Sequence, residues 1–154
     1  MTEEKNVNKN AMLTIKSQYI KDLSFENPNA PASFMMAKIT PDIQVALDLG
    51  AKNLENNASY EVVLHLKIEA KQEKSTMFLL ELSYGTNVII QDLDQNHIQP
   101  VLFVDVPYLM FPFVRQIVAD MTKNGGFVPL MLDPINFAEL FNQRNQKVDN
   151  NQKN

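Results

Sequence analysis

The sequence contains no cysteine. Disulfide bonds, thiol nucleophiles and cysteine-based metal sites are therefore excluded, and the absence favours a cytosolic location. The first ten residues, MTEEKNVNKN, contain no apolar segment of the kind found in signal peptides. The longest apolar run, residues 101–118, is interrupted by two charged residues and two prolines. We therefore expect no segment that inserts into a membrane.

The motifs of common enzyme sites are also absent. Neither GxGxxG nor GxxxxGK[ST] occurs, and no serine has the GxSxG context. Of the two histidines, His65 is predicted on the exposed face of a strand and His97 in a loop. That loop also carries Asp92 and Asp94, but it lacks the additional carboxylates and the glycine turn of a cation-binding loop. We predict no enzymatic activity, no cofactor and no bound metal.

The charge balance limits the class of partner. The chain has 18 acidic and 14 basic residues, a net charge of −4 and a pI near 5.1. No basic stripe is present that could neutralise phosphates, so a nucleic-acid partner is excluded. Clustered acidic side chains would instead favour a basic partner.

The chain is long enough for one domain. It has 154 residues, of which 45% are hydrophobic and 21% charged. Residues 1–10 are predicted to be a disordered tail, and residues 11–141 the folded domain. From Asn142 the chain is rich in Asn, Gln and Lys and poor in apolar residues, so 142–154 is predicted to be a flexible polar tail.

Alternating apolar residues predict four strands, at 13–20, 42–50, 60–71 and 78–90. In the first, Leu13, Ile15 and Tyr19 are expected on one side. The short polar segment QEKS separates the third and fourth strands and predicts a hairpin. One apolar and one polar face on each strand indicate an antiparallel sheet.

The spacing then changes to that of helices. Residues 106–126 repeat apolar side chains at i, i+3, i+4 and i+7, with Pro107 in the first turn, Pro112 as a kink or restart, and a glycine stop. Asp133 followed by Pro134 predicts the start of a second helix. The fold class is therefore α+β, a four-stranded antiparallel sheet followed by two helices.

The first of these helices is apolar on nearly every side. Tyr108, Leu109, Phe111 and Phe113 cannot all face one sheet, and a helix of this kind needs cover from several directions. Another copy of the chain would supply that cover. We therefore infer an oligomer with helices in its interior.

Two candidate surfaces remain. The first is acidic and consists of two candidate patches, Asp22 with Glu26, spaced i, i+4, and Glu81 with Leu79. The second is apolar and lies around the second helix and the loop FVPLML (127–132). Core packing is the alternative for the apolar set, and ordinary solvated charge is the alternative for the acidic set.

In order and spacing, several stretches together resemble the SecB family of bacterial export chaperones. They are YIKDLSFENPNAP, YEVVLHLKIEA, FLLELSYG, LMFPFVRQIV and GGFVPLMLDPINFAELF. The resemblance covers Leu13 to Phe141. It implies a cytosolic homotetramer, a dimer of dimers with the helices between the sheets. It also implies an ATP-independent chaperone that holds unfolded precursor proteins and delivers them to SecA.

The resemblance also implies roles for residues. Asp22, Glu26, Leu79 and Glu81 match positions that bind the basic, zinc-bearing C-terminal end of SecA, and the zinc belongs to SecA. Leu80, Leu82 and Tyr84 match positions of packing and assembly. The positions that line or lie beneath client-binding grooves are Phe111, Val114, Phe127, Leu130, Met131, Phe137, Leu140 and Phe141.

Two features depart from the family pattern. The C-terminal segment is amide-rich and mildly basic where the family commonly has an acidic tail, and GTN follows Tyr84 where a second glycine is usual. Two alternative functions stay open. One is a small-ligand regulatory domain, and the other is a SecB-like chaperone of a toxin–antitoxin pair.

Overall fold

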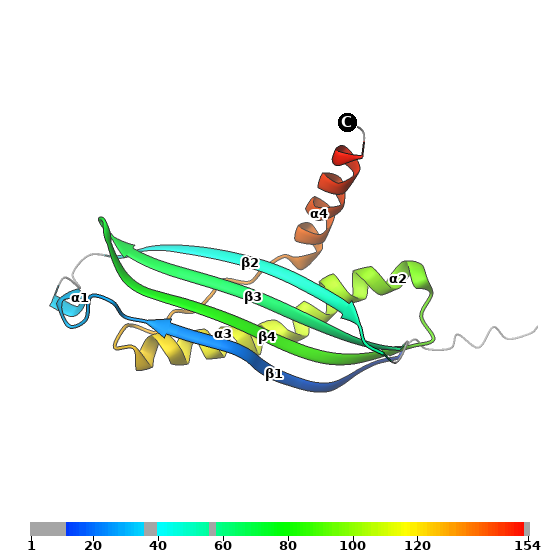
Figure 1. Cartoon of the computed structure of the whole chain (residues 1–154), viewed down its shortest axis with the longest axis horizontal. Helices are drawn as coiled ribbons and strands as arrows, with labels where there is room; N and C mark the ends of the chain where they lie inside the picture. Colours follow the sequence, from blue (N-terminus) through cyan, green and yellow to red (C-terminus); the bar gives the residue numbers. More distant parts are fainter. Residues whose placement is uncertain (1–11, 36–39, 56–57, 153–154) are drawn as a thin grey trace, which may run out of the picture.

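The computed structural model describes residues 12–35, 40–55 and 58–152, so the predicted tail at 1–10 lies outside the described residues. Four strands form one sheet in the order β1-β4-β3-β2 (Figure 1). They are β1 (Met12–Glu26), β2 (Asp42–Asn53), β3 (Ser59–Gln72) and β4 (Ser75–Gln91). Every neighbouring pair is antiparallel, which confirms the sequence prediction.

The hairpin between β3 and β4 is also confirmed. Gln72 pairs with Ser75, so only Glu73 and Lys74 form the connection. Glu73 adopts a positive φ of 55°, as tight hairpin turns require.

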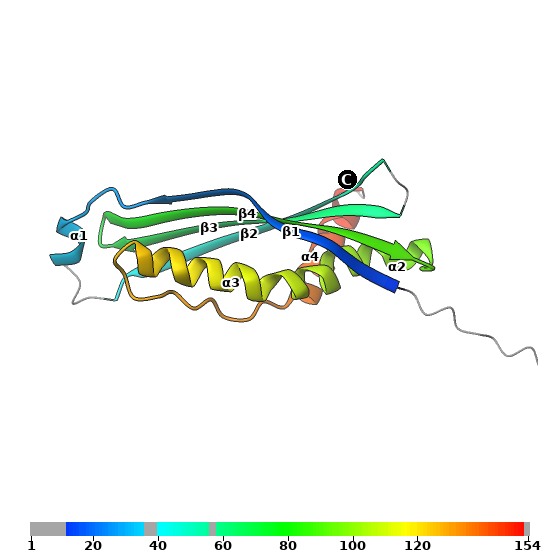
Figure 2. The same cartoon turned by 90° about the horizontal axis from the view of Figure 1, so that it is seen from below.

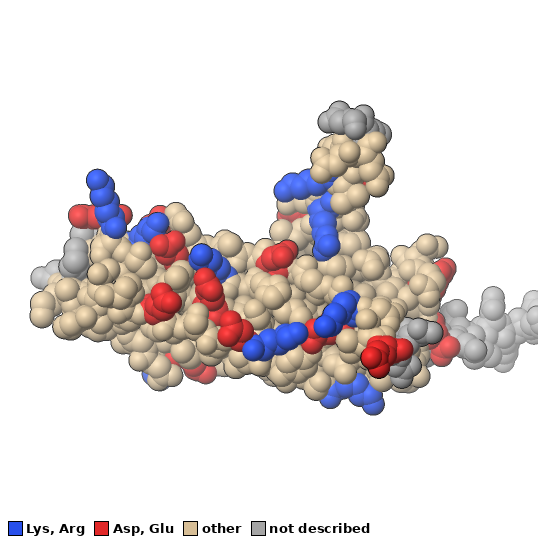
Figure 3. Space-filling model, viewed as in Figure 1, with Lys and Arg blue, Asp and Glu red and all other residues tan. Residues whose placement is uncertain are grey.

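A long helix covers one face of the sheet, and the other face is open. Figure 2 shows α3 lying along the underside of the strands, and Figure 3 shows acidic and basic side chains distributed over the uncovered face. The core lies between the helix and the sheet. Leu64, Ile68 and Leu80 contact it from the strands, and Met110 and Val114 contact it from the helix, all with at most 2% of their surface exposed.

Strand β1 departs from the predicted alternation. Its pairing with β4 shifts between Ile15 and Ser17, and again between Ile20 and Asp22. Each bulge adds one residue and exchanges the two faces of the strand. Tyr19 therefore pairs with Gly85 on the outer face, and the prediction that it shares a side with Leu13 is wrong.

The covering helix begins earlier than the sequence predicted. It consists of α2 (Gln95–Pro100), a π-helical segment (Val101–Asp105) and α3 (Val106–Asn124). The side chain of Asp94 accepts a hydrogen bond from the backbone N–H of Asn96 and caps α2. His97 consequently lies in a helix and not in a loop.

Three prolines are accommodated within this helix, and the first, Pro100, ends α2. Pro107 occupies the first turn of α3, directly after the π-helical segment, and Pro112 lies inside α3. Because proline cannot donate to the carbonyl four residues earlier, a helix normally kinks or restarts there. The wider π turn before Pro107 relaxes that geometry without ending the helix.

The joined helix Gln95–Asn124 spans 30 residues and has the length and composition of a membrane-crossing helix. From the sequence, we expected the charged residues and prolines of this region to exclude a membrane-crossing segment. In the structure, 44% of its most apolar window is buried inside the molecule. Its hydrophobicity is thus accounted for in part by packing on the sheet.

Two further helices are short or peripheral. The first, α1 (Ala32–Met35), follows β1, and α4 (Phe137–Asn151) ends the described chain. The start predicted at Asp133 is wrong, because Asn136 is the N-cap and its side chain accepts from the Glu139 N–H. Helix α4 also continues through residues 142–151, where composition predicted a flexible tail. Its Gln, Arg and Lys residues favour helix even though they bury little surface.

Candidate functional site

The four residues of the predicted acidic surface lie together on the open face of the sheet. Glu26 of β1 pairs with Leu79 of β4, and Ser24 pairs with Glu81. Residues directly opposite in an antiparallel pair point to the same face. Asp22, two positions before Ser24, shares that face and pairs with Ser83. We call Asp22, Glu26, Leu79 and Glu81 the acidic surface.

The charges of this surface are accessible to solvent. Asp22 and Glu26 are exposed, and Leu79 is half-buried beside them. An ion pair joins Glu81 of this surface to Lys67 of β3 at 3.7 Å, with 49% and 57% of the two side chains exposed. Such a pair contributes little energy, so Glu81 can exchange Lys67 for another cation at small cost.

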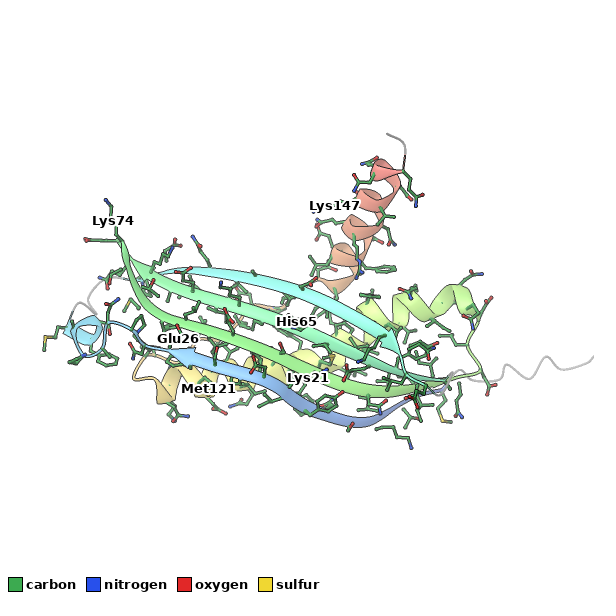
Figure 4. All side chains as sticks on the ribbon, viewed as in Figure 1. Lys21, Glu26, His65, Lys74, Met121 and Lys147 are labelled. Atoms are coloured by element: carbon green, nitrogen blue, oxygen red, sulfur yellow. The ribbon has the colours of Figure 1, made fainter. Side chains whose placement is uncertain are left out.

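A shallow hollow borders the acidic surface. It has a volume of about 340 Å³, and Asp22, Asp48, His65 and Glu81 are among its lining residues. The ring of His65 lies 2.8 Å from the hydroxyl of Ser83. Figure 4 shows that His65 lies on the same open face as Glu26 and Lys21.

A cluster around Glu61 lies further along this face, and sequence analysis did not find it. The Tyr19 hydroxyl donates to Glu61 Oε2 at 2.5 Å, and Lys21 Nζ donates to Oε1 at 3.0 Å. Lys52 of β2 approaches the same carboxylate at 3.5 Å. We call Tyr19, Lys21, Glu61 and Gly85 the β1 clamp. Tyr19 and Glu61 are 42 positions apart, so no local pattern could have linked them.

The clamp alters the ionisation of its members. Burial, followed by the hydrogen bond to Glu61, raises the pKa of Tyr19 to about 12. The hydrogen bond from Tyr19, with the charges of Lys21 and Lys52, lowers the pKa of Glu61 against the opposing effect of burial. The contribution of Glu61 to folding is thus present above its unfolded pKa and is lost as pH falls through the folded value. Near neutral pH the carboxylate is charged and the phenol is neutral.

The residues assigned to packing and assembly lie on the opposite face of β4. Leu80, Leu82 and Tyr84 are buried beneath the helix layer of the same chain. Their side chains support the sheet from within one subunit. Any effect on assembly would be transmitted through the position of α3 or of the strand.

An apolar hollow of about 350 Å³ lies at one end of the molecule. We call it the aromatic hollow; its apolar lining includes Phe34, Ile43, Met77, Phe78, Phe127 and Leu130. The ring of Phe127 lies 5.0 Å from that of Phe78 and 5.3 Å from that of Phe34. Phe34 and Phe78 were not predicted as site residues, because their segments signalled only a loop and a strand.

The loop that forms this hollow is held by hydrogen bonds that include the 3.0 Å bond from the Phe127 N–H to the Thr122 carbonyl. The buried hydroxyl of Thr122 accepts the N–H of Leu130 at 2.9 Å. The side chain of Asn27 donates to the carbonyl of Gly125 at 3.0 Å, which joins the end of β1 to the end of α3. Gly126 has φ +91°, and a Cβ there would lie 2.8 Å from the Phe34 ring. Only glycine fits both the conformation and the space.

A second hollow of about 440 Å³ lies between α4 and β2. We call it the α4 hollow; its lining includes Leu47, Leu49, Phe103, Leu140, Phe141 and Val148. Phe103 and Phe141 stack with their centroids 6.0 Å apart, and Arg144 lies over Phe103 at 4.4 Å. Lys147, labelled on α4 in Figure 4, also lines this hollow.

The predicted client-binding residues lie in different surroundings. Phe127 and Leu130 line the aromatic hollow, and Leu140 and Phe141 line the α4 hollow. Phe111 and Val114 are buried in the hydrophobic core. Met131 is exposed but is not among the lining residues of either hollow.

Phe137 has a different place from the one predicted. It is fully buried, where a groove residue was expected. Its ring meets Tyr108 and Phe111 edge-on at 5.1 and 6.0 Å. Phe137 therefore anchors the first turn of α4 in the core, between the two hollows.

Among the described residues, no group of three or more His, Asp or Glu side chains could hold a metal ion. The segment around Asp92 and Asp94 has a structural role. Asp92 adopts a positive φ of 56° after β4, and Asp94 caps α2.

The chain was compared with known proteins and families. The family model of SecB, described as preprotein translocase subunit SecB, matches residues 6–148. A protein-export protein SecB of Bartonella bacilliformis is 44% identical over 142 residues, which cover 92% of this chain and 89% of that protein. Another from Paramagnetospirillum magneticum is 50% identical over 133 residues, covering 86% and 84% of the two chains.

A solved structure shows the same fold at low sequence identity. It is a SecB-like chaperone of Mycobacterium tuberculosis in complex with a peptide from an antitoxin. The TM-score is 0.65 at 12% identity, and the match covers 80% of this chain and 90% of that one. At this identity the likeness concerns the fold alone.

Proposed function

The chain belongs to the SecB family, and we propose that it is an ATP-independent chaperone that holds unfolded precursor proteins in the cytoplasm and delivers them to SecA for export. SecB proteins are chaperones and not a class of enzyme. A holding chaperone acts by mass action on the unfolded state, so it needs neither a nucleotide nor a catalytic residue.

The observation that best supports this activity is the pair of hollows at the chain surface: the aromatic hollow is mainly apolar, and the α4 hollow combines apolar side chains with Arg144 and Lys147. Phe34 in the aromatic hollow and Leu140 in the α4 hollow have 40% and 38% of their surface exposed. Burying one large apolar client side chain in such a hollow yields roughly 1.5–3 kcal/mol. An unfolded chain offers many such side chains, whereas a folded one conceals them, which gives the selectivity that a chaperone needs.

The acidic surface is proposed as the docking site for the basic, zinc-bearing C-terminal end of SecA. Three exposed carboxylates would attract a basic segment, and the half-buried Leu79 would add apolar contact. Each exposed ion pair supplies only about 0.2–1 kcal/mol. Several copies of the surface in one assembly would strengthen binding through avidity.

We further propose that the assembly is a homotetramer, a dimer of dimers with helices between sheets. In support, Leu109 and Phe113 have 45% and 52% of their surface exposed on the side of α3 away from the sheet. A second chain could cover these side chains and leave the open face of the sheet accessible.

Replacement of Glu81 by Lys tests the separation of the two activities. Glu81 and the two hollows lie on different parts of the chain, so Glu81→Lys should weaken SecA binding by about tenfold or more and leave client affinity nearly unchanged. Leu140→Ala is the matched control, because it should weaken client binding and leave SecA binding intact. Titrations of both variants against SecA and against an unfolded client give the measurement. A parallel loss of both activities in Glu81→Lys would contradict the assignment.

The alternative functions receive less support. The antitoxin peptide belongs to a neighbour at 12% identity, whereas relatives at 44% and 50% identity are named for protein export. A small-ligand site would need convergent polar groups in a pocket, and the aromatic hollow is lined mainly by apolar side chains.

A further inference from the structure

The second bulge of β1 determines which way the acidic surface faces. Ile20 pairs with Tyr84 on the core face of the sheet, and the next paired residue is Asp22, opposite Ser83 on the outer face. Lys21 is the extra residue between them. With strict alternation from Ile20, Asp22 would point into the core. The bulge at Lys21 therefore places Asp22, and the acidic surface with it, on the open face.

The β1 clamp holds this bulge through Glu61 of β3, the strand on the far edge of β4 from β1. Tyr19 precedes the bulge and Lys21 occupies it, and both donate to the carboxylate of Glu61 on β3. Strand β4, which lies between β1 and β3, places Gly85 opposite Tyr19. A Cβ on Gly85 would lie 2.5 Å from Cε2 of Tyr19, so glycine leaves the space in which the ring crosses β4.

The clamp is strong enough to fix a local conformation. Only 12% of the Glu61 side chain is exposed, and hydrogen bonds to a carboxylate are stronger than those between neutral groups. Glu61 is ionised near neutral pH, and its lowered pKa extends the charged state to more acidic conditions. Thr86 adds a further contact at the first bulge, where its buried hydroxyl donates to the Ser17 carbonyl at 3.0 Å.

We propose that Tyr19, Lys21, Glu61 and Gly85 are positioning residues for partner docking: they fix the bulge at Lys21 and thereby hold Asp22 on the outer face. None of the four belongs to the acidic surface itself. The use of that surface by SecA rests on the proposed function, whereas the effect of the clamp on the conformation of β1 does not.

Tyr19→Phe and Glu61→Gln test the inference. Tyr19→Phe keeps the ring over Gly85 and removes one hydrogen bond, while Glu61→Gln removes the charge. Each should weaken SecA binding about threefold to tenfold, the effect of one hydrogen bond. Each should also speed hydrogen exchange of the backbone amides at residues 20–24, and neither should change affinity for an unfolded client.

Lys52→Met is the matched control. Lys52 approaches the same carboxylate from β2, with 65% of its side chain exposed, and does not touch the bulge. It should change SecA affinity by less than about twofold and leave exchange at residues 20–24 unaltered.

The outcomes separate the inference from the proposed function. If Glu81→Lys weakens SecA binding but Tyr19→Phe and Glu61→Gln change neither affinity nor exchange, the clamp has no positioning role. Equal losses of SecA and client binding in the clamp variants would also overturn the inference, because they would indicate general loosening. If Glu81→Lys has no effect on SecA binding, the docking proposal is wrong, and the exchange measurement alone decides whether the clamp orients β1.

Discussion

At the level of single residues, Gly126 controls the shape of the aromatic hollow. Its φ of +91° and the 2.8 Å approach of the Phe34 ring both oppose a side chain. We predict that Gly126→Ala lowers the free energy of unfolding by about 1–2 kcal/mol, because residues with a Cβ disfavour this conformation. Denaturant titration measures the change.

Gly50→Ala serves as the control for this prediction. Gly50 lies in β2 with nothing within 4 Å of the position of a Cβ, so alanine there should be neutral or slightly stabilising. Equal losses of stability in the two variants would show that the geometry around Gly126 is not responsible.

At the level of elements, α4 is joined to the body of the molecule mainly through its first turn. Phe137 is fully buried, whereas every described residue from Asn142 onward is exposed. Figure 1 shows α4 projecting away beyond the edge of the sheet at β2. Its outer turns therefore contribute little to the core and much to the wall of the α4 hollow.

Removal of residues 142–154 should separate these two contributions. We predict that the truncated chain unfolds within about 1 kcal/mol of the full chain, since exposed positions contribute little to stability. Client affinity should fall, because Arg144, Lys147 and Val148 no longer line the hollow. Phe137→Ala, by contrast, should cost about 3–5 kcal/mol. Thermal unfolding and client titration provide the measurements, and full client affinity after truncation would exclude a role for the outer part of α4.

Sequence alternation predicted the inner part of the sheet well because β3 has neighbours on both sides and one covered face. The predicted strand at 60–71 corresponds to Ser59–Gln72, and the one at 78–90 to Ser75–Gln91. The faces of β1 were harder to predict, because two bulges shift the alternation of its side chains between the faces and no local residue pattern marks them. Tyr19 was placed on the wrong face for this reason.

The spacing of residues predicted the two halves of the acidic surface separately, Asp22 with Glu26 and Leu79 with Glu81, and only the family resemblance joined them. The i, i+4 spacing of Asp22 and Glu26 keeps them on one face once both follow the same bulge. The β1 clamp could not be predicted, since it joins residues that meet only when three strands are aligned. The start of α4 was also missed, since Asp133 and Asn136 are both good caps and only the burial of Phe137 selects the second.

At the level of the whole molecule, one chain leaves a large apolar area uncovered. Tyr108, Leu109 and Phe113 are exposed on α3, and Ile15 and Ile20 on β1. Monomeric soluble proteins rarely expose large contiguous apolar patches, and exposed apolar side chains on one helix and one strand are candidates for contacts with another chain. This exposure is explained if the protein assembles through one apolar region and binds clients at another.

Light scattering tests the assembly. The native protein should have a mass near four times the 17.6 kDa of one chain. Phe113→Arg should lower that mass, because an arginine on the exposed side of α3 would leave a charge buried between copies. A native mass of one chain would contradict the tetramer, and an unchanged mass in Phe113→Arg would exclude this part of α3 from the interface.

We expect the uncovered apolar surface to bind unfolded chains without ATP. The most direct measurement is fluorescence anisotropy with one labelled protein in two forms, its native state and a permanently unfolded variant, in the absence of nucleotide. We expect saturable binding of the unfolded form and no binding of the native form. Equal binding of both forms, or binding of neither, would contradict it.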